Sequence, residues 1–196
     1  EAYSATTADQ NAALAQNAGT LTVTKGTFTK SGDDTNGDNC NFYGINSIIL
    51  AAGDGTKAYI SGSSLSASSQ GSNGIFSTDS ALVYANSDTI ATTADNSRGL
   101  DATYGGTIVA NDMKITTQGD HCAAIATDRG GGDISVANST LSTAGSGSPL
   151  LYSTGDIEVD NVTGTASGSQ IAGMEGLNTI LIYNSTLEST LTKATA

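Results

Sequence analysis

The sequence predicts an all-β protein, a right-handed parallel β-helix of about seven to eight coils. Two observations lead to this fold: similar segments recur every 23 to 26 residues, and each segment holds short stretches of alternating aliphatic and polar residues. A fixed repeat near 25 residues indicates a solenoid, because each unit buries its apolar face only against its neighbours. We expect one domain over 1–196, with three short strands in each coil and no helix between them.

The first strand of each coil is the clearest. It alternates aliphatic and polar residues, as in Ile134–Val136, Ile157–Val159 and Ile180–Ile182. Period-two alternation places the aliphatic side chains on one face of a strand. Parallel strands joined in this way cross over with a right hand in nearly all known cases, which gives the predicted handedness.

The second and third strands each show one aliphatic residue that we expect to point inward. In the second strand these residues are Phe28, Leu65, Ile90, Ile115, Leu141 and Leu187. In the third strand they are Leu14, Ile45, Ile75, Leu100, Ile125, Leu151 and Met174.

An asparagine follows the first strand in coil after coil. These asparagines are Asn86, Asn111, Asn138, Asn161 and Asn184. A turn one or two residues wide needs a positive φ angle, which Asn tolerates better than other residues except Gly. Identical amides stacked one coil apart, about 4.8 Å, can hydrogen-bond along the axis. We therefore predict an asparagine ladder with a structural role.

Composition and charge exclude several kinds of partner. The chain carries 19 acidic and 7 basic residues, for a net charge of −12. Nucleic acids and anionic membranes are excluded as partners, because phosphate binding needs clustered Lys and Arg. No apolar run reaches the roughly 18 residues of a membrane-spanning helix. Few Lys and many Ser, Thr and Asn residues favour an extracellular or cell-surface location.

The two ends of the chain predict incomplete coils. We expect residues 1–20 to form an incomplete first coil and residues 188–196 to form an uncapped end. Solenoids usually carry polar caps, since a bare terminal coil leaves backbone N–H and C=O groups unpaired. Two explanations stand at this point. The chain is a piece of a longer surface protein with flanking domains, or copies stack head to tail into filaments, as heterologous interfaces do.

A long acidic loop, 30–43, interrupts the early repeat. Its residues Asp34, Asn36 and Asp38 alternate in the spacing D-x-N-x-D, which would suit calcium, a cation that prefers oxygen ligands. The alternative is a solvated acidic loop without metal, and no other cofactor is expected. The loop also holds Cys40, and the only other cysteine is Cys122. Either the loop folds along the solenoid so that the two pair in a disulfide, or both are free thiols.

The outward face of the third strand is the other candidate surface. It is predicted to carry Phe76, Asp101, Asp128, Tyr152 and Glu175. Aromatic rings stack on sugar rings and carboxylates accept hydrogen bonds from hydroxyl groups, so this face would bind a glycan. The three acids also suit the acid and base of a glycosidase. The simplest alternative is a solvated face of an acidic protein.

The repeat resembles a group of adhesin-like right-handed β-helix surface proteins, with a pectate-lyase-like fold, from anaerobic bacteria and some archaea. The segments that carry the resemblance are Asp38–Asn46, Asn73–Ala81, Thr92–Thr107, Ala126–Gly132 and Gly147–Ile157. The resemblance implies the fold and an extracellular location, and no particular activity. The segment Gly119–Ile125 also resembles the GDDC motif of polygalacturonases. His121 replaces its second aspartate and is the only histidine, so catalysis of that type is excluded.

These observations rank three functions. The first is a non-catalytic extracellular structural or adhesive protein, with self-assembly into filaments as its expected association. The second is a carbohydrate-binding module that uses the third-strand face. A polysaccharide-degrading enzyme ranks third.

Overall fold

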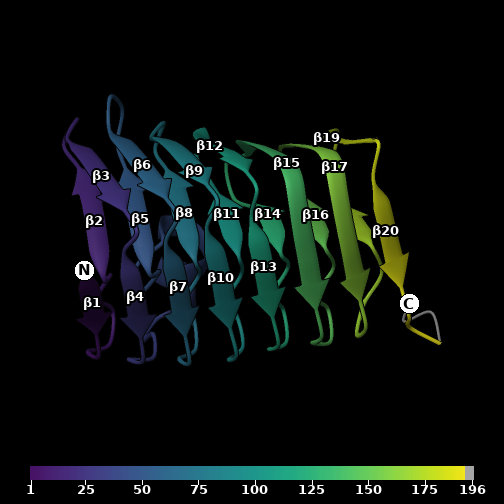
Figure 1. Ribbon diagram of the computed structural model, residues 1–196, viewed down its shortest axis with the longest axis horizontal. Helices are drawn as coiled ribbons and strands as arrows, with labels where there is room; N and C mark the ends of the chain where they lie inside the picture. The colour runs from purple at the N-terminus through teal and green to yellow at the C-terminus, as the bar shows by residue number, and fades with distance from the viewer. Residues whose placement is uncertain (193–196) are drawn as a thin grey trace.

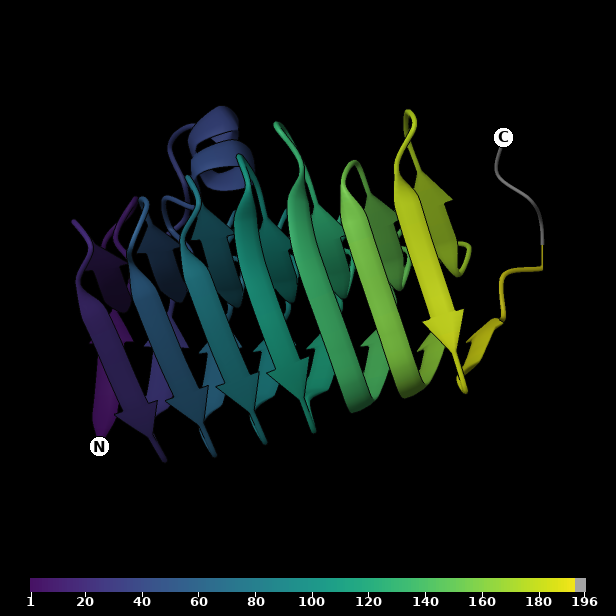
Figure 2. The ribbon, with the colours of Figure 1, turned by 90° about the horizontal axis from the view of Figure 1, so that it is seen from above.

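The computed structural model describes residues 1–192 as a parallel β-solenoid of about eight turns (Figure 1). Each turn contributes one strand to each of three faces, and every strand pair is parallel. The predicted all-β solenoid is therefore confirmed. Among the described residues there is one helix, α1 (Gly37–Tyr43), which stands outside the coils in Figure 2. The prediction of no helix was wrong at this segment.

The strands are short because each face of the triangle is narrow. The first face is formed by β3 (Thr20–Thr24), β6 (Lys57–Ser61), β9 (Leu82–Asn86), β12 (Gly106–Asn111) and β19 (Thr179–Tyr183). The second face is formed by β1 (Ala2–Ala5), β4 (Thr27–Lys30), β7 (Ser64–Ala67), β10 (Thr89–Thr92), β13 (Lys114–Thr117) and β20 (Thr186–Ser189). The strands β15 (Gly132–Thr143) and β17 (Asp156–Ala166) bend through the first turn and belong to both faces.

The third face carries the candidate site. It is formed by β2 (Ala13–Gln16), β5 (Ile49–Ala52), β8 (Ile75–Thr78), β11 (Leu100–Ala102), β14 (Ile125–Thr127), β16 (Leu151–Ser153) and β18 (Ala172–Met174).

The core is a set of aliphatic columns that run along the axis. On the second face, Phe28 pairs with Leu65, which pairs with Ile90 and so on through the predicted residues. From Phe28 to Leu141 these side chains are buried against the inward residues of the other two faces, whereas Leu187, which follows Gly164 in the column, is partly buried. Each coil thus covers the apolar face of the next, which is how a narrow solenoid excludes water.

Three of the expected inward residues of the third face were wrong. Leu14 and Met174 are 47 and 52 % exposed, and Ile45 lies in the turn before β5. The register instead places Ala13, Ile49 and Ala172 inward, in line with Ile75. Small alanines fill this position in the first and the last coil of the face, whereas the prediction chose the larger residues Leu14, one position after Ala13, and Met174, two positions after Ala172.

The asparagine side chains do hydrogen-bond along the axis. Asn111 donates to Asn86 over 2.8 Å, Asn138 to Asn111 over 2.7 Å, and Asn161 to Asn138 over 2.7 Å. Asn184 donates to Asp160 and not to Asn161, its counterpart in the preceding coil. The positive φ lies on Asn138, Asn161 and Asn184 themselves, whereas at Asn86 and Asn111 it lies on the following residue.

A second ladder is buried at the turn before the third face. The backbone N–H of Ser72 donates to Ser97 Oγ, that of Ser97 to Cys122 Sγ, and that of Cys122 to Ser148 Oγ. All four side chains are buried. Cys122 therefore takes a place that serine holds in the neighbouring coils, and its role there is structural.

The disulfide prediction was wrong, because Cys40 and Cys122 are both free and buried. Cys40 lies in α1, where its thiol contacts the carbonyl of Gly37 in the same helix. Burial raises the pKa of the Cys40 thiol to about 12 and that of Cys122 to about 11. Both groups are therefore protonated thiols at neutral pH.

The acidic loop folds back over the third face, and the helix within it is capped at both ends. Asn36 Oδ1 accepts from the N–H groups of Asp38 and Asn39, which is an N-cap. Gly44 ends the helix with a φ of 70°. The D-x-N-x-D spacing thus has a structural explanation in helix capping. Of the predicted uncapped end, 188–196, residues 193–196 lie outside the described residues.

Candidate functional site

The segment 31–48 covers the middle of the outward face of the third sheet, where Gly44 lies on Leu50 and Phe76 and Phe42 contacts Thr103. The outward column runs through Leu50, Phe76, Asp101, Ala126 and Tyr152, and all but Tyr152 are buried. The expectation of an open face was therefore wrong at Phe76, which lies under Gly44, and at Asp101, which is 0 % exposed. The outward column is open at Leu14 in β2 and around Tyr152 in β16.

Four contacts fasten the helix to the sheet. Asn73 Nδ2 donates to the Cys40 carbonyl over 3.0 Å, and Arg98 Nη1 donates to Asn41 Oδ1 over 2.7 Å. Thr103 Oγ1 donates to the Phe42 carbonyl over 2.8 Å. The Arg129 guanidinium lies 3.6 Å from the centroid of the Phe42 ring, a cation–π contact. These contacts fix the position of the helix on the third sheet.

Arg98 is the centre of the charged cluster. Its Nε lies 3.7 Å from Asp101 Oδ2, and its Nη2 lies 3.6 Å from Asp128 Oδ2. Burial raises the pKa of the Asp101 carboxyl well above its ordinary value, and the nearby Asp128 charge adds to this, while Arg98 opposes it. Burial likewise raises the pKa of Asp128 against the effect of Arg98. The Arg98 guanidinium therefore lies beside two carboxyl groups whose charged form is disfavoured by burial.

A cleft of about 220 Å³ lies beside this cluster. Its walls are Arg98, His121, Ala123, Asp128, Gly147, Pro149 and Tyr152. Burial, together with a hydrogen bond to Glu175, raises the pKa of the Tyr152 hydroxyl to about 12. We call this the Arg98 cleft. It offers an aromatic ring, a carboxylate and an imidazole in one concave surface, which is a common composition for recognition of small polar molecules.

The structure brings together most of the predicted ligand residues. Asp128 and Tyr152 line the Arg98 cleft, Glu175 adjoins it through Tyr152, and Asp101 lies beneath it. Phe76 is separate from the cleft. Sequence reasoning missed Arg98 and set His121 aside. One signal was present for Arg98: it is one of two arginines in a strongly acidic chain, and it lies three residues before Asp101.

The predicted calcium ligands Asp34, Asn36 and Asp38 lie at the start of α1 and just before it. Asn36 caps the helix, and one oxygen of Asp34 is buried without a partner beside Gly71. Within 1–192, no group of three or more His, Cys, Asp or Glu side chains is arranged to hold a metal ion.

Comparison of the chain with protein-family models, with curated proteins and with solved structures found no match. Over the described residues, no helix has the length and apolar character needed to cross a membrane.

Proposed function

We propose that the protein is a non-catalytic, extracellular β-helix of the adhesin-like type that binds glycans at the Arg98 cleft. The observation that carries the proposal is the convergence of His121 and Asp128, which flank β14, and Tyr152 of β16 in the next coil, on one cleft. The solenoid supplies a rigid support, so these groups are held in place before a ligand arrives. Preorganised polar groups beside an aromatic ring suit a sugar, which has hydroxyl groups and an apolar ring face.

The charge of the cleft favours neutral or amino sugars over acidic ones. The Arg98 guanidinium already contacts Asp101, Asp128 and Asn41, so few of its donors are left for a ligand carboxylate. Asp128 and Glu175 leave an excess of negative charge around Tyr152. A uronic acid would meet these carboxylates, whereas a hydroxyl or an amine would donate to them.

Burial of Asp101 supports a binding role over a hydrolytic one. A glycosidase needs two carboxyl groups in contact with the sugar. Asp101 is sealed under the helix segment, and its oxygens have no hydrogen-bond partner among the described residues. It holds Arg98 and does not reach the cleft.

Glycan-array and titration measurements with Tyr152→Ala test the proposal. We expect the wild type to bind neutral or amino-sugar glycans and Tyr152→Ala to bind them about tenfold more weakly, a loss of about 1.4 kcal/mol. Tyr59→Ala is the control, since Tyr59 is an exposed tyrosine on the first face. Equal binding by Tyr152→Ala and the wild type would exclude the cleft, and release of reducing ends from any bound glycan would contradict a non-catalytic role.

Head-to-tail assembly is a second candidate function. In the last described coil, Leu181, Ile182 and Tyr183 are 40 to 47 % exposed. Another coil laid on this surface, from the same chain or from a second molecule, would cover Ile182 as Ile182 covers Val159. Filaments seen by electron microscopy, increasing with protein concentration, would support assembly of copies, and dispersed short rods at every concentration would argue against it.

A further inference from the structure

A second hollow lies at the other end of helix α1, away from the Arg98 cleft. It has a volume of about 470 Å³ and is lined by Tyr43, Ala52, Thr78, Asp79 and Tyr104. This volume is in the usual range of ligand pockets, which is about 300–1,000 Å³. We call it the tyrosine groove. None of the residues predicted to bind ligand lies in it.

Two tyrosine rings form its aromatic wall. The rings of Tyr43 and Tyr104 stack with centroids 5.6 Å apart and planes 8° from parallel. Tyr43 is the last residue of α1 and is 45 % exposed, whereas Tyr104 comes from the turn after β11. Segments 61 residues apart thus bring two tyrosine rings into one stack at the edge of the groove.

The turn after β11 holds Tyr104 in a left-handed backbone conformation, as the same turn one coil earlier holds Asp79. Tyr104 has a φ of 46°, a left-handed conformation that is uncommon for an aromatic residue. In the next coil, a Cβ on Gly130 would lie 2.5 Å from Tyr104 Cδ1, so only glycine leaves room for the ring. An aromatic residue at this turn position, with glycine beside it in the next coil, is what distinguishes the Tyr104 coil from its neighbours.

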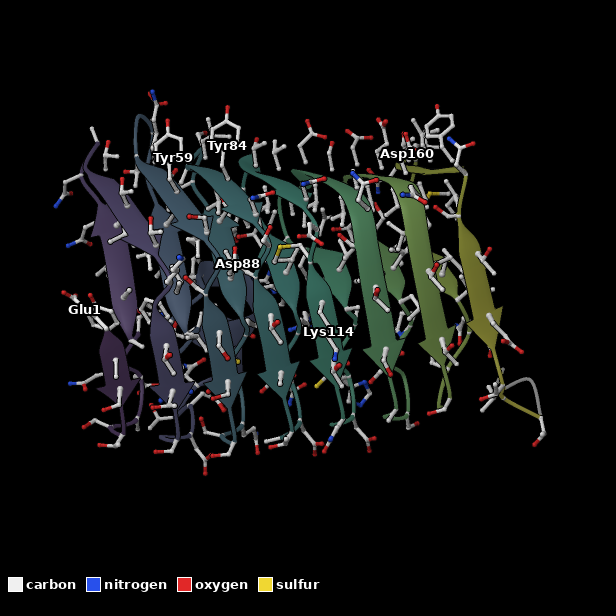
Figure 3. All side chains as sticks on the ribbon, viewed as in Figure 1. Glu1, Tyr59, Tyr84, Asp88, Lys114 and Asp160 are labelled. Carbon is white, nitrogen blue, oxygen red and sulfur yellow. The ribbon has the colours of Figure 1, made fainter. Side chains whose placement is uncertain are left out.

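A matched tyrosine pair elsewhere shows that stacking alone does not create such a groove. Tyr59 and Tyr84 stack on the first face, 5.4 Å apart and 7° from parallel, side by side on neighbouring coils (Figure 3). Both lie in regular strands with no positive φ. Neither contributes to one of the hollows described above. The tyrosine groove therefore combines stacked rings, backbone strain and concavity, where the Tyr59–Tyr84 pair has the stacked rings alone.

We propose that the tyrosine groove is a second carbohydrate site, which stacks a pyranose ring of a neutral β-1,4-linked glucan. An all-equatorial sugar presents flat C–H faces to an aromatic wall and hydroxyl groups at its edge. Asp79, the one carboxylate that lines the groove, accepts from such hydroxyl groups. A quaternary ammonium ligand fits less well, since aromatic cages for cations surround the charge with ring faces, and these rings are nearly parallel.

Titration with cellohexaose tests this site, with dextran and choline chloride as comparison ligands. The chain has no Trp and seven Tyr, so intrinsic tyrosine fluorescence reports ligand contact directly, and calorimetry gives the affinity. Two variants remove the wall. Tyr43→Ala removes the exposed ring, and Tyr104→Asn places at the positive φ a residue that tolerates it, so the fold is retained. Tyr59→Ala is the matched control.

We expect cellohexaose to bind the wild type and Tyr59→Ala equally, and Tyr43→Ala and Tyr104→Asn at least about tenfold more weakly. Unchanged far-ultraviolet circular dichroism and thermal midpoint will show that Tyr104→Asn is folded. No binding of cellohexaose, preference for dextran, or binding of choline alone overturns the proposal.

Tyr152→Ala separates this site from the Arg98 cleft. If Tyr152→Ala abolishes cellohexaose binding while Tyr43→Ala and Tyr104→Asn retain it, the ligand occupies the cleft and the groove proposal fails. If Tyr43→Ala and Tyr104→Asn alone weaken it, the groove is a site in its own right, whatever the cleft binds.

Discussion

At the scale of single residues, one position of the buried turn between the first and second faces holds a carboxylate where other coils hold serine or an apolar residue. Ser63 Oγ, Ser139 Oγ and Ser185 Oγ each accept a backbone N–H from the preceding coil. Asp88 holds the same place one coil after Ser63 and accepts from the N–H groups of Ser63 and Asn86 (Figure 3). A carboxylate thus performs a task that a neutral hydroxyl performs elsewhere.

Burial raises the pKa of Asp88 to about 6, although its two backbone hydrogen bonds oppose the shift. A carboxyl group whose pKa is higher in the folded state binds its proton more tightly there. Its stabilising contribution is therefore complete below about pH 4, its unfolded pKa, and is lost as the pH rises to about 6.

We predict that Asp88→Ser raises the free energy of unfolding at pH 7 by about 1–3 kcal/mol, because one pKa unit corresponds to about 1.4 kcal/mol. The lower end of this range allows for a lost hydrogen bond, because the backbone N–H of Asn86 donates to the Asp88 carboxylate in the wild type. The gain will shrink towards zero at pH 4, where wild-type Asp88 is largely protonated. Urea unfolding of both proteins at pH 4 and pH 7 measures the difference.

Asp112→Ser is the control for this prediction, because Asp112 is an exposed carboxylate in the same turn one coil further on. It should change stability little at either pH. A gain for Asp88→Ser that is equal at pH 4 and pH 7 would show that its charge is not the cause.

At the scale of elements, α1 was beyond the reach of the repeat pattern. The strands of the first and second faces could be predicted, since each coil repeats the same alternation of inward and outward residues. The insertion has no counterpart in other coils, and only Asn36 and Gly44 mark the ends of a helix of seven residues. The contacts that place it join residues far apart in sequence, such as Arg98 and Asn41.

The candidate site was predictable in part for the same reason. Asp128 and Tyr152 follow from strand alternation in the coils that the helix leaves uncovered. Phe76 and Asp101 obey the same alternation, yet the helix covers them, and covering by an insertion leaves no periodic signal. Tyr43 was missed because its position depends on where the insertion lies.

Gly44 is the residue that seats α1 on the sheet. We predict that Gly44→Ala destabilises the protein by about 1–3 kcal/mol, the usual cost of overpacking a core. Its φ of 70° disfavours a side chain, and a Cβ would lie 2.6 Å from the Phe76 ring. Thermal unfolding measures the loss, and limited proteolysis should cut 31–48 sooner as the helix lifts.

Gly37→Ala supplies the matched control in the same helix. A Cβ there would approach nothing closer than Asn41 Nδ2 at 3.9 Å, and Ala favours helix over Gly. It should leave stability unchanged or slightly improved. Equal losses of stability in Gly44→Ala and Gly37→Ala would contradict this prediction. They would show that a methyl group is not tolerated anywhere in α1, and that the contact of Gly44 with Phe76 is not the cause.

At the scale of the whole molecule, stability comes from contacts between adjacent coils. The column Val136, Val159 and Ile182 shows this, since the three residues share a register and differ in cover. Val159 is fully buried between two coils, whereas Ile182, in the last described coil, is 46 % exposed. The same side-chain position therefore contributes differently according to its place along the axis.

We predict that Val159→Asp lowers the free energy of unfolding by about 3–5 kcal/mol, because it buries an unpaired charge. Ile182→Asp should cost less than about 1 kcal/mol in dispersed molecules, since water still reaches that position. Urea unfolding at low protein concentration measures both.

If copies stack through this end, Ile182→Asp will also abolish filaments that the wild type forms at high concentration, because a stacked coil would bury the new charge. Filaments of Ile182→Asp equal to those of the wild type would show that any assembly uses another surface, and a loss at Ile182 as large as that at Val159 would mean that the end coil is covered in solution.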